Sequence, residues 1–191
     1  MSLTPSNMMP LGTKAPDFNL IDVVTSEMVS LENIRGNNGT VVMFICNHCP
    51  YVIHVNEEMV RVANDYRING FGFVAISSND VENYPEDSPK NMLITAENND
   101  YTFPYLYDET QEVAKAYNAA CTPDIYLFGA DLKLIYRGQL DNSRPGNMIQ
   151  PTGRDLREAL DSVLNNSPQR KDQKPSMGCN IKWKNKKSSQ S

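Results

Sequence analysis

The sequence has no long apolar run: nothing in its 191 residues approaches the roughly 20 consecutive apolar residues that a membrane-spanning helix needs. Its first eleven residues also lack the basic segment followed by an apolar stretch that is typical of a secretion signal. These two absences predict a soluble, cytoplasmic protein with no membrane partner.

Cysteine is scarce as well. The chain has four cysteines, and in a sequence of this length they do not make the disulfide framework of a small secreted protein. In a reducing compartment such cysteines are catalytic, metal-binding or simply buried. Each cysteine therefore needs its own argument.

Positive charge is scarce in most of the chain. The first 165 residues carry 11 Lys and Arg against 22 Asp and Glu, a net charge of −11, whereas residues 166–191 carry seven Lys and Arg against one Asp, a net charge of +6. A nucleic-acid partner would require a basic surface on the fold itself, so the overall charge of −5 argues against one. With 40% hydrophobic residues, we expect one domain over residues 10–165 and a basic tail over residues 166–191 that docks on it.

The most informative segment is an apolar strand that leads into a helix through two cysteines. Residues 41–45 are all apolar, which is typical of a strand buried on both faces of a sheet. Over residues 51–69, apolar side chains recur every three or four positions, which predicts an amphipathic helix that ends at Gly70. Pro50 suits the first helical turn, where its missing N–H is not needed, so Cys49 should be the N-cap.

Cys49 is the candidate nucleophile. A sulfur at a helix N-terminus faces unpaired backbone N–H groups and the positive end of the helix dipole, which favour the thiolate over the thiol. The adjacent His48 could lower the pKa of this thiol further or deliver a proton to a leaving thiolate. Alternatively, His48 is a partly exposed side chain that packs beside the turn.

The remaining pattern is that of an α/β protein. Strands are expected at residues 18–22, 27–30, 71–77, 125–128 and 134–137, and helices at residues 89–97, 110–117 and 153–164. The cysteine strand, its helix and the strand at 71–77 form a βαβ unit, and ligands bind at the carboxyl ends of such strands. We therefore expect one mixed central sheet flanked by helices, with an N-terminal β-hairpin and a C-terminal extension.

Several motifs resemble those of the thioredoxin-like superfamily. Residues 15–20 resemble the segment with which the peroxiredoxin domain begins, and residues 103–108 resemble the mid-domain motif of that family. Thr122-Pro123 resembles the cis-proline loop of the superfamily. Three further segments resemble a peroxiredoxin-like redoxin group of the alkyl hydroperoxide reductase and thiol-specific antioxidant type: residues 47–52, 84–89 and 175–184. The resemblance covers nearly the whole chain and implies a thioredoxin-like fold with a redox-active, antioxidant cysteine.

The sequence also departs from these families around Cys49. Where thioredoxins have the second cysteine of their redox motif, this chain has Val52. Where peroxiredoxins have a proline and a threonine before the peroxide-reacting cysteine, it has Val42 and Cys46. The threonine hydroxyl that would orient a peroxide is therefore missing.

Two of the other cysteines could resolve an oxidised Cys49 from nearby loops. Cys46 forms a Cys-x-x-Cys pair with Cys49, and residues three apart in a turn can reach disulfide distance with some strain. Cys121 precedes Thr122-Pro123, and the resemblance implies that this loop faces the N-terminus of the helix that carries Cys49. Alternatively, Cys121 is a small residue that fills a crowded loop.

Cys179 is the third candidate resolving cysteine. Cys179, Ile181 and Trp183 alternate with polar residues, so the apolar side of this segment should pack on the body and turn the sulfur inward. Its two lysines would then lie on an exposed edge strand. A cysteine on a docked, detachable strand suits a resolving role. The alternative is that Trp183 anchors the C-terminus and Cys179 is merely packed.

Two supporting features leave alternatives open. Arg137 could stabilise the thiolate, or it could pair with an acidic neighbour such as Asp141. A zinc site can be drawn from Cys46, Cys49, Cys179 and a histidine, but a second paired motif of the usual spacing is missing. We therefore expect neither a metal nor an organic cofactor.

The sequence thus predicts a thiol-disulfide oxidoreductase with Cys49 as the attacking thiolate. Cys49 would form a mixed disulfide with a protein or small-molecule disulfide, or a sulfenic acid with a hydroperoxide, before a second cysteine releases it. A thiol reductant would complete the cycle. The alternatives are a thiol peroxidase that reduces hydroperoxides and a non-catalytic binding module that keeps the fold.

Overall fold

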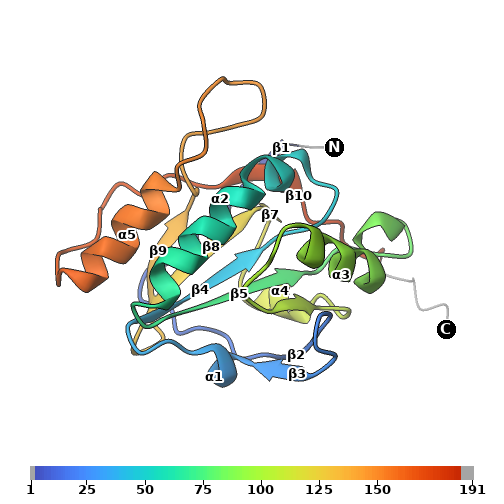
Figure 1. The fold of residues 1–191 in the computed structure, drawn as a ribbon, viewed down its shortest axis with the longest axis horizontal. Coiled ribbons are helices and arrows are strands. Elements are labelled where there is room, and N and C mark those ends of the chain that lie inside the picture. Colours follow the sequence, from blue (N-terminus) through green and yellow to red (C-terminus); the bar gives the residue numbers. More distant parts are fainter. Residues whose placement is uncertain (1–2, 186–191) are drawn as a thin grey trace.

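The computed structural model describes residues 3–185, and a seven-stranded sheet forms its centre. The strands of this sheet are β2 (Asn19–Asp22), β3 (Met28–Ser30), β4 (Gly39–Phe44), β5 (Phe71–Ser77), β6 (Tyr105–Tyr107), β8 (Asp124–Gly129) and β9 (Leu134–Gly138). They are arranged in the order β3-β2-β6-β5-β4-β8-β9 (Figure 1). The neighbours β4, β5 and β6 run parallel and the other pairs antiparallel, which confirms the expected mixed sheet.

Helices cover both faces of this sheet. They are α1 (Leu31–Ile34), α2 (Pro50–Arg67), α3 (Pro89–Asn98), α4 (Glu112–Ala116) and α5 (Arg154–Leu164), with a short 3-10 turn η1 (Pro85–Asp87) before α3. Side chains of α2, α3 and α5 share one apolar cluster with one face of the sheet, and those of α1 and α4 share a second cluster with the other face. Figure 1 shows α2, α3 and α5 on the near side of the sheet.

Strand β4 lies in the middle of both clusters. Val41 and Met43 point into the α2 side and Val42 and Phe44 into the opposite side, and all four are at most 1% exposed. This arrangement confirms the prediction of a strand buried on both faces. It also fixes the point at which the chain leaves the sheet toward the cysteines.

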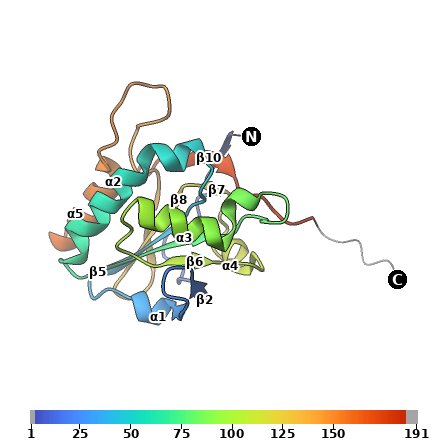
Figure 2. The same ribbon diagram turned by 45° about the vertical axis from the view of Figure 1, so that its right-hand side comes forward.

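A second, three-stranded sheet joins the two ends of the described chain. It consists of β1 (Leu3–Pro5), β10 (Met177–Asn180) and β7 (Cys121–Thr122), paired antiparallel in the order β1-β10-β7. Both ribbon views place β10 and β7 next to the N-terminal end of α2 (Figure 2). The C-terminal segment is therefore built into the neighbourhood of the cysteines.

The structure differs from the sequence expectations at four strands. Strands β1, β6 and β7 were not expected, because two or three residues are too few to show a periodic pattern. Strand β10 is a central strand and not an exposed edge, and it ends before the lysines of the alternating pattern. Beyond it, Lys182 is buried and Trp183 is 40% exposed, the reverse of the expected alternation, because the backbone of Lys182 is held by Asn79 and Asp80.

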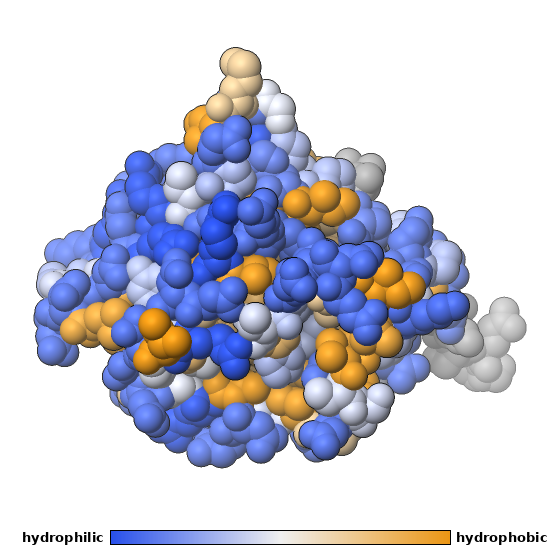
Figure 3. Space-filling view, in the orientation of Figure 1, coloured by the Kyte–Doolittle hydropathy of each residue, from blue (hydrophilic) through white to orange (hydrophobic). Residues whose placement is uncertain are grey.

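The surface is mostly polar. Figure 3 shows apolar residues as separate spots among hydrophilic ones on the face that carries α2. The loop between β9 and α5 projects from the body and carries the exposed Met148 and Ile149 (Figure 1). Within residues 3–185, no helix combines the length and the apolar character that a membrane crossing requires.

Candidate active site

Cys49 is the N-cap of α2. Its backbone is extended (φ −72°, ψ 120°), Pro50 occupies the first turn, and the N–H of Ile53 donates to the Cys49 carbonyl oxygen at 3.0 Å. The side chain of Cys49 is fully buried. Its sulfur is therefore at the N-terminal end of the helix, as the sequence predicted, but beneath other parts of the chain.

The sulfur of Cys49 contacts that of Cys179 of strand β10. The two Sγ atoms are 2.9 Å apart, and Cys49 Sγ also lies 3.2 Å from the carbonyl oxygen of Thr122. Cys46 Sγ lies 3.4 Å from the hydroxyl of Thr122. Three of the four cysteines thus meet around one residue of the loop before Pro123, and all four are reduced.

The surroundings favour a thiolate at Cys49. A hydrogen bond from Cys46 is the largest cause that lowers the pKa of Cys49 to about 5, and burial opposes it. Further hydrogen bonds from Cys179, from Thr122 and from the backbone N–H of Val52 act in the same direction as Cys46. The helix N-terminus and two thiol donors together stabilise the negative charge.

The other three cysteines keep their protons. The hydrogen bond to Cys49, then burial and the nearby Asp87 raise the pKa of Cys46 well above its usual value. Burial, followed by the hydrogen bond to Cys49, raises the pKa of Cys179 to about 12, and burial raises the pKa of Cys121. Cys49 is therefore the one cysteine whose thiol pKa is lowered, and all four cysteines lie in the described residues.

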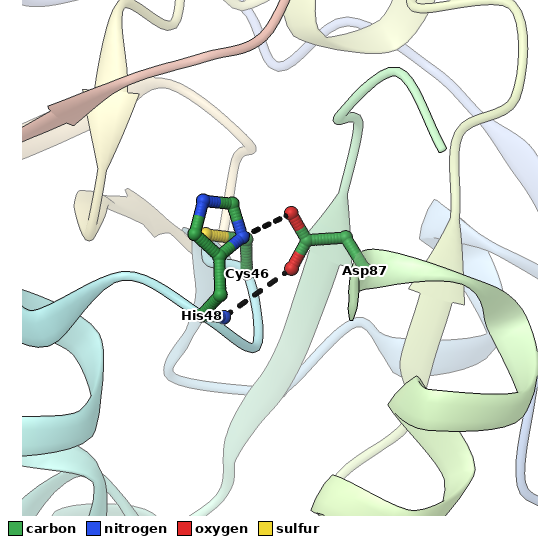
Figure 4. A group of neighbouring side chains, drawn as sticks. All are labelled: Cys46, His48 and Asp87. Carbon is green, nitrogen blue, oxygen red and sulfur yellow. Dashed lines mark hydrogen bonds and ion pairs between the residues drawn. The ribbon is translucent and has the colours of Figure 1, made fainter. Parts of the chain in front are cut away.

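Asp87 supports the turn that carries Cys49. Its carboxylate is fully buried and accepts hydrogen bonds from the backbone N–H groups of Asn47 (2.8 Å) and His48 (3.3 Å) and from Asn79 Nδ2 (2.7 Å). His48 Nδ1 lies 2.7 Å from Asp87 Oδ2, and Figure 4 shows the imidazole facing this carboxylate. Asp87 was not expected to belong to the site, since its only signal in the sequence is a place in the segment 84–89, which resembles the redoxin group.

The Thr122–Pro123 peptide bond is cis, as the resemblance implied. Thr122 is paired with Cys179 across β7 and β10, and this pairing is tight: a Cβ on Gly178 would lie 1.9 Å from the Thr122 carbonyl oxygen. Strand β10 therefore occupies the position directly beside the cis-proline loop and covers the sulfur of Cys49.

Cys121 and Arg137 lie apart from this thiol contact. Cys121 Sγ donates to the carbonyl oxygen of Pro123 at 3.6 Å. Arg137, considered as a partner of the thiolate, instead donates to the Met9 carbonyl oxygen (2.8 Å) and to Gln173 Oε1 (2.7 Å). Its guanidinium therefore links β9 to the N-terminal segment at Met9 and to the segment before β10 at Gln173.

Comparison with known proteins agrees with this architecture. Residues 11–137 match the AhpC/TSA family, and no curated protein matches the chain. Two solved structures are similar over nearly their whole length. An uncharacterized conserved protein from Geobacillus kaustophilus is 60% identical with a TM-score of 0.95, covering 96% of this chain and 97% of that one. A hypothetical protein from Sinorhizobium meliloti is 43% identical with a TM-score of 0.92, covering 95% and 98%.

A more distant structure shows the fold alone. A putative thiol:disulfide interchange protein from Chlorobium tepidum is 18% identical with a TM-score of 0.65, and the similarity covers 82% of this chain and 99% of that one. This similarity confirms the expected thioredoxin-like α/β fold with a mixed central sheet flanked by helices.

Proposed function

The chain belongs to the AhpC/TSA family, and we propose that it is a thiol-disulfide oxidoreductase in which Cys49 attacks and Cys179 resolves. The observation that carries this proposal is the 2.9 Å contact between the two sulfur atoms, one of which has a pKa of about 5. Cys46, the alternative from the Cys-x-x-Cys pattern, then acts as a hydrogen-bond donor to the thiolate.

The proposed reaction has two exchange steps. The Cys49 thiolate attacks one sulfur of a substrate disulfide, forms a mixed disulfide and releases the other substrate sulfur as a thiolate. The Cys179 sulfur then attacks Cys49 Sγ, its proton passes to the departing substrate sulfur, and a Cys49–Cys179 disulfide remains. The substrate gains two electrons, and an external thiol reductant returns the protein to its dithiol form.

The pKa values support this order of events. Part of the rise in the pKa of Cys179 comes from its hydrogen bond to Cys49 and from the charge of Cys49. Once Cys49 is in a mixed disulfide, it carries no negative charge, so this part of the rise is removed. Cys179 would therefore become a better nucleophile only after Cys49 has reacted.

A hydroperoxide is the second candidate oxidant, and the burial of Cys49 favours it. Because the side chain of Cys49 has no exposed surface beneath β10, a small molecule can reach it with less movement of the chain than a protein disulfide requires. The thiolate would attack the peroxide, give cysteine sulfenic acid and an alcohol or water, and condense with Cys179 with loss of water. The cysteine at position 46 still replaces the threonine typical of peroxiredoxins.

Mass-spectrometric disulfide mapping tests the proposal. The reduced protein is exposed separately to hydrogen peroxide and to oxidised glutathione, and free thiols are alkylated before digestion. We expect a Cys49–Cys179 bridge, and in Cys179→Ser a trapped sulfenic acid or glutathione adduct on Cys49; Cys121→Ser is the matched control and should form the bridge. The oxidant that forms the bridge faster identifies the substrate class.

Two outcomes would count against the proposal. A bridge between Cys46 and Cys49 would assign the resolving role to Cys46. Four reduced cysteines after both treatments, together with an ordinary pKa for Cys49, would favour a non-catalytic binding module.

A further inference from the structure

Cys46, His48 and Asp87 form a group of possible metal ligands beside the thiol pair. One donor atom from each residue, the sulfur, a ring nitrogen and a carboxylate oxygen, lies within 4.8 Å of the other two. Figure 4 shows the three side chains gathered around one point, reached from the end of β4, the turn before α2 and the turn η1. Cys46 and Asp87 are buried, and the His48 side chain is 18% exposed.

The chemistry of these donors selects the kind of ion. Calcium and magnesium take oxygen ligands, whereas zinc takes thiolate, imidazole and carboxylate ligands in a tetrahedral site. We propose that the reduced protein binds one zinc ion through Cys46, His48 and Asp87, with a water molecule in the fourth position of the tetrahedron. This proposal does not depend on the redox function proposed above.

The charges around the group also favour a cation. The carboxylate of Asp87 is fully buried, and its oxygen lies within 4.8 Å of the Cys46 sulfur and the His48 ring nitrogen. The ammonium of Lys182 lies over the ring of Tyr84 and donates to the Asn180 side chain and carbonyl oxygen. A divalent ion would offset the charge of the carboxylate and allow Cys46 to bind as a thiolate.

Neighbouring groups hold the ligands in place. The Asp87 carboxylate is fixed by the N–H of Asn47 and the amide of Asn79, and Cys46 by the Thr122 hydroxyl. Such outer hydrogen bonds orient metal ligands.

The imidazole needs only a small movement to bind the ion. The ring of His48 stacks on Tyr84 with their centroids 5.8 Å apart. Its buried Nδ1 lies 2.7 Å from Asp87 Oδ2, close enough for an ion pair, but no described group is aligned for a hydrogen bond with it. Nitrogen and oxygen ligands of tetrahedral zinc are about 3.3 Å apart, so these two atoms need to separate by about half an ångström.

Cobalt and zinc titrations test the site in the full chain. The protein is reduced, freed of metal with a chelator and titrated with Co²⁺, which is then displaced with Zn²⁺. We expect one ion per chain, a thiolate-to-cobalt charge-transfer band, the intense visible bands of a tetrahedral ion, and protection of Cys46 from alkylation. Cys46→Ser and His48→Gln should weaken zinc binding more than the roughly 10- to 100-fold typical of losing an outer hydrogen bond.

Matched controls separate this site from incidental binding. His54→Gln removes the other histidine, which contacts Ser143, and Cys121→Ser removes a buried cysteine outside the group; both should bind zinc like the unaltered protein. Circular dichroism checks that each variant is folded, and Cys46→Ser and His48→Gln carry the conclusion because Asp87→Asn also disturbs the turn before Cys49. The absence of a charge-transfer band, or unchanged affinity in folded Cys46→Ser or His48→Gln, would overturn the proposal.

Discussion

Cys49 owes its acidity to other thiols and not to a cationic side chain. The donors to its sulfur are Cys46, Cys179 and Thr122 at the N-terminus of α2, and together they outweigh the opposing effect of burial. A hydrogen bond to a charged group contributes about 1.5–3 kcal/mol, which corresponds to roughly one to two pKa units. Cys46, the largest contributor, is therefore a residue whose removal can be measured directly.

Replacing Cys46 with Ala should raise the pKa of Cys49 from about 5 by roughly one to two units, because the strongest donor to the thiolate is lost. The measurement is the pH dependence of alkylation at Cys49, followed at that site by mass spectrometry under reducing conditions. Cys121→Ala is the control and should leave the midpoint unchanged. An unchanged midpoint in Cys46→Ala would refute the assignment of Cys46 as the main donor.

The residues of this group differ in how far the sequence could predict them. Cys49 and Pro50 follow from a local pattern, because a strand, a proline and a helical repeat lie next to one another. Asp87 could not be found this way, since its burial depends on hydrogen bonds to residues 39 and 40 positions earlier in the chain. A single sequence does not indicate which of its acidic side chains is enclosed by a distant turn.

At the scale of the elements, strand β10 covers the sulfur of Cys49. It is paired on both sides, with β1 and with β7, and places Cys179 against Cys49. The sequence predicted a docked strand here from its alternating pattern, but not that it would be central, because the pattern does not reveal the pairing partner. The close packing of Gly178 on Thr122 makes this pairing sensitive to a single methyl group.

Gly178→Ala should separate β10 from the cis-proline loop. The added Cβ would lie 1.9 Å from the Thr122 carbonyl oxygen, so the strand must shift, and we expect a loss of about 1–3 kcal/mol in the free energy of unfolding. Alkylation of Cys49 should become faster and formation of the Cys49–Cys179 disulfide slower. Gly129→Ala is the control, since its Cβ would meet only side chains, that of Asp131 at 3.3 Å and that of Ile135 at 3.7 Å. Equal effects of the two substitutions would show that the contact with Thr122 is unimportant.

Asp124, the first residue of β8, makes the stability of the fold depend on pH. Burial raises its pKa to about 6, although Ser6, the backbone of Ala120 and Tyr126 donate to the carboxylate. A carboxyl group with a raised folded-state pKa stabilises the fold when it is protonated. Its contribution is complete below the unfolded-state value of about 4 and is lost as the pH rises through 6.

Asp124→Asn should therefore remove part of the pH dependence of stability. A shift of about two units corresponds to about 3 kcal/mol that the unaltered protein loses between pH 4 and 7, and the variant should lose less over this interval. Urea unfolding at several pH values gives the free energies, with Asp131→Asn at an exposed turn as the control. Parallel curves for the Asp124 variant and the unaltered protein would mean that the buried carboxyl does not titrate in this range.

On the scale of the whole molecule, the site is assembled from segments that are far apart in sequence. The turn before α2, η1, the cis-proline loop and β10 meet at one end of the sheet, and the two sulfurs in contact belong to residues 130 positions apart. The sequence predicted the fold from local patterns and family motifs. It left three cysteines as possible partners of Cys49, because no local pattern reports a contact over such a separation.

Because Cys49 and Cys179 are so far apart in sequence, the change in the free energy of unfolding on oxidation tests whether these two cysteines form the disulfide. A Cys49–Cys179 disulfide would close a loop of 130 residues and, from loop-closure entropy, stabilise the protein by at most about 5 kcal/mol, whereas a Cys46–Cys49 bridge closes only a short turn and would add about 2 kcal/mol. Urea unfolding of the reduced and oxidised forms measures the difference. We expect a gain of roughly 4–5 kcal/mol on oxidation, absent in Cys179→Ser and retained in Cys121→Ser. A gain that persists without Cys179 would place the disulfide elsewhere, and an oxidised form less stable than the reduced one would mean that closing this bridge distorts β10.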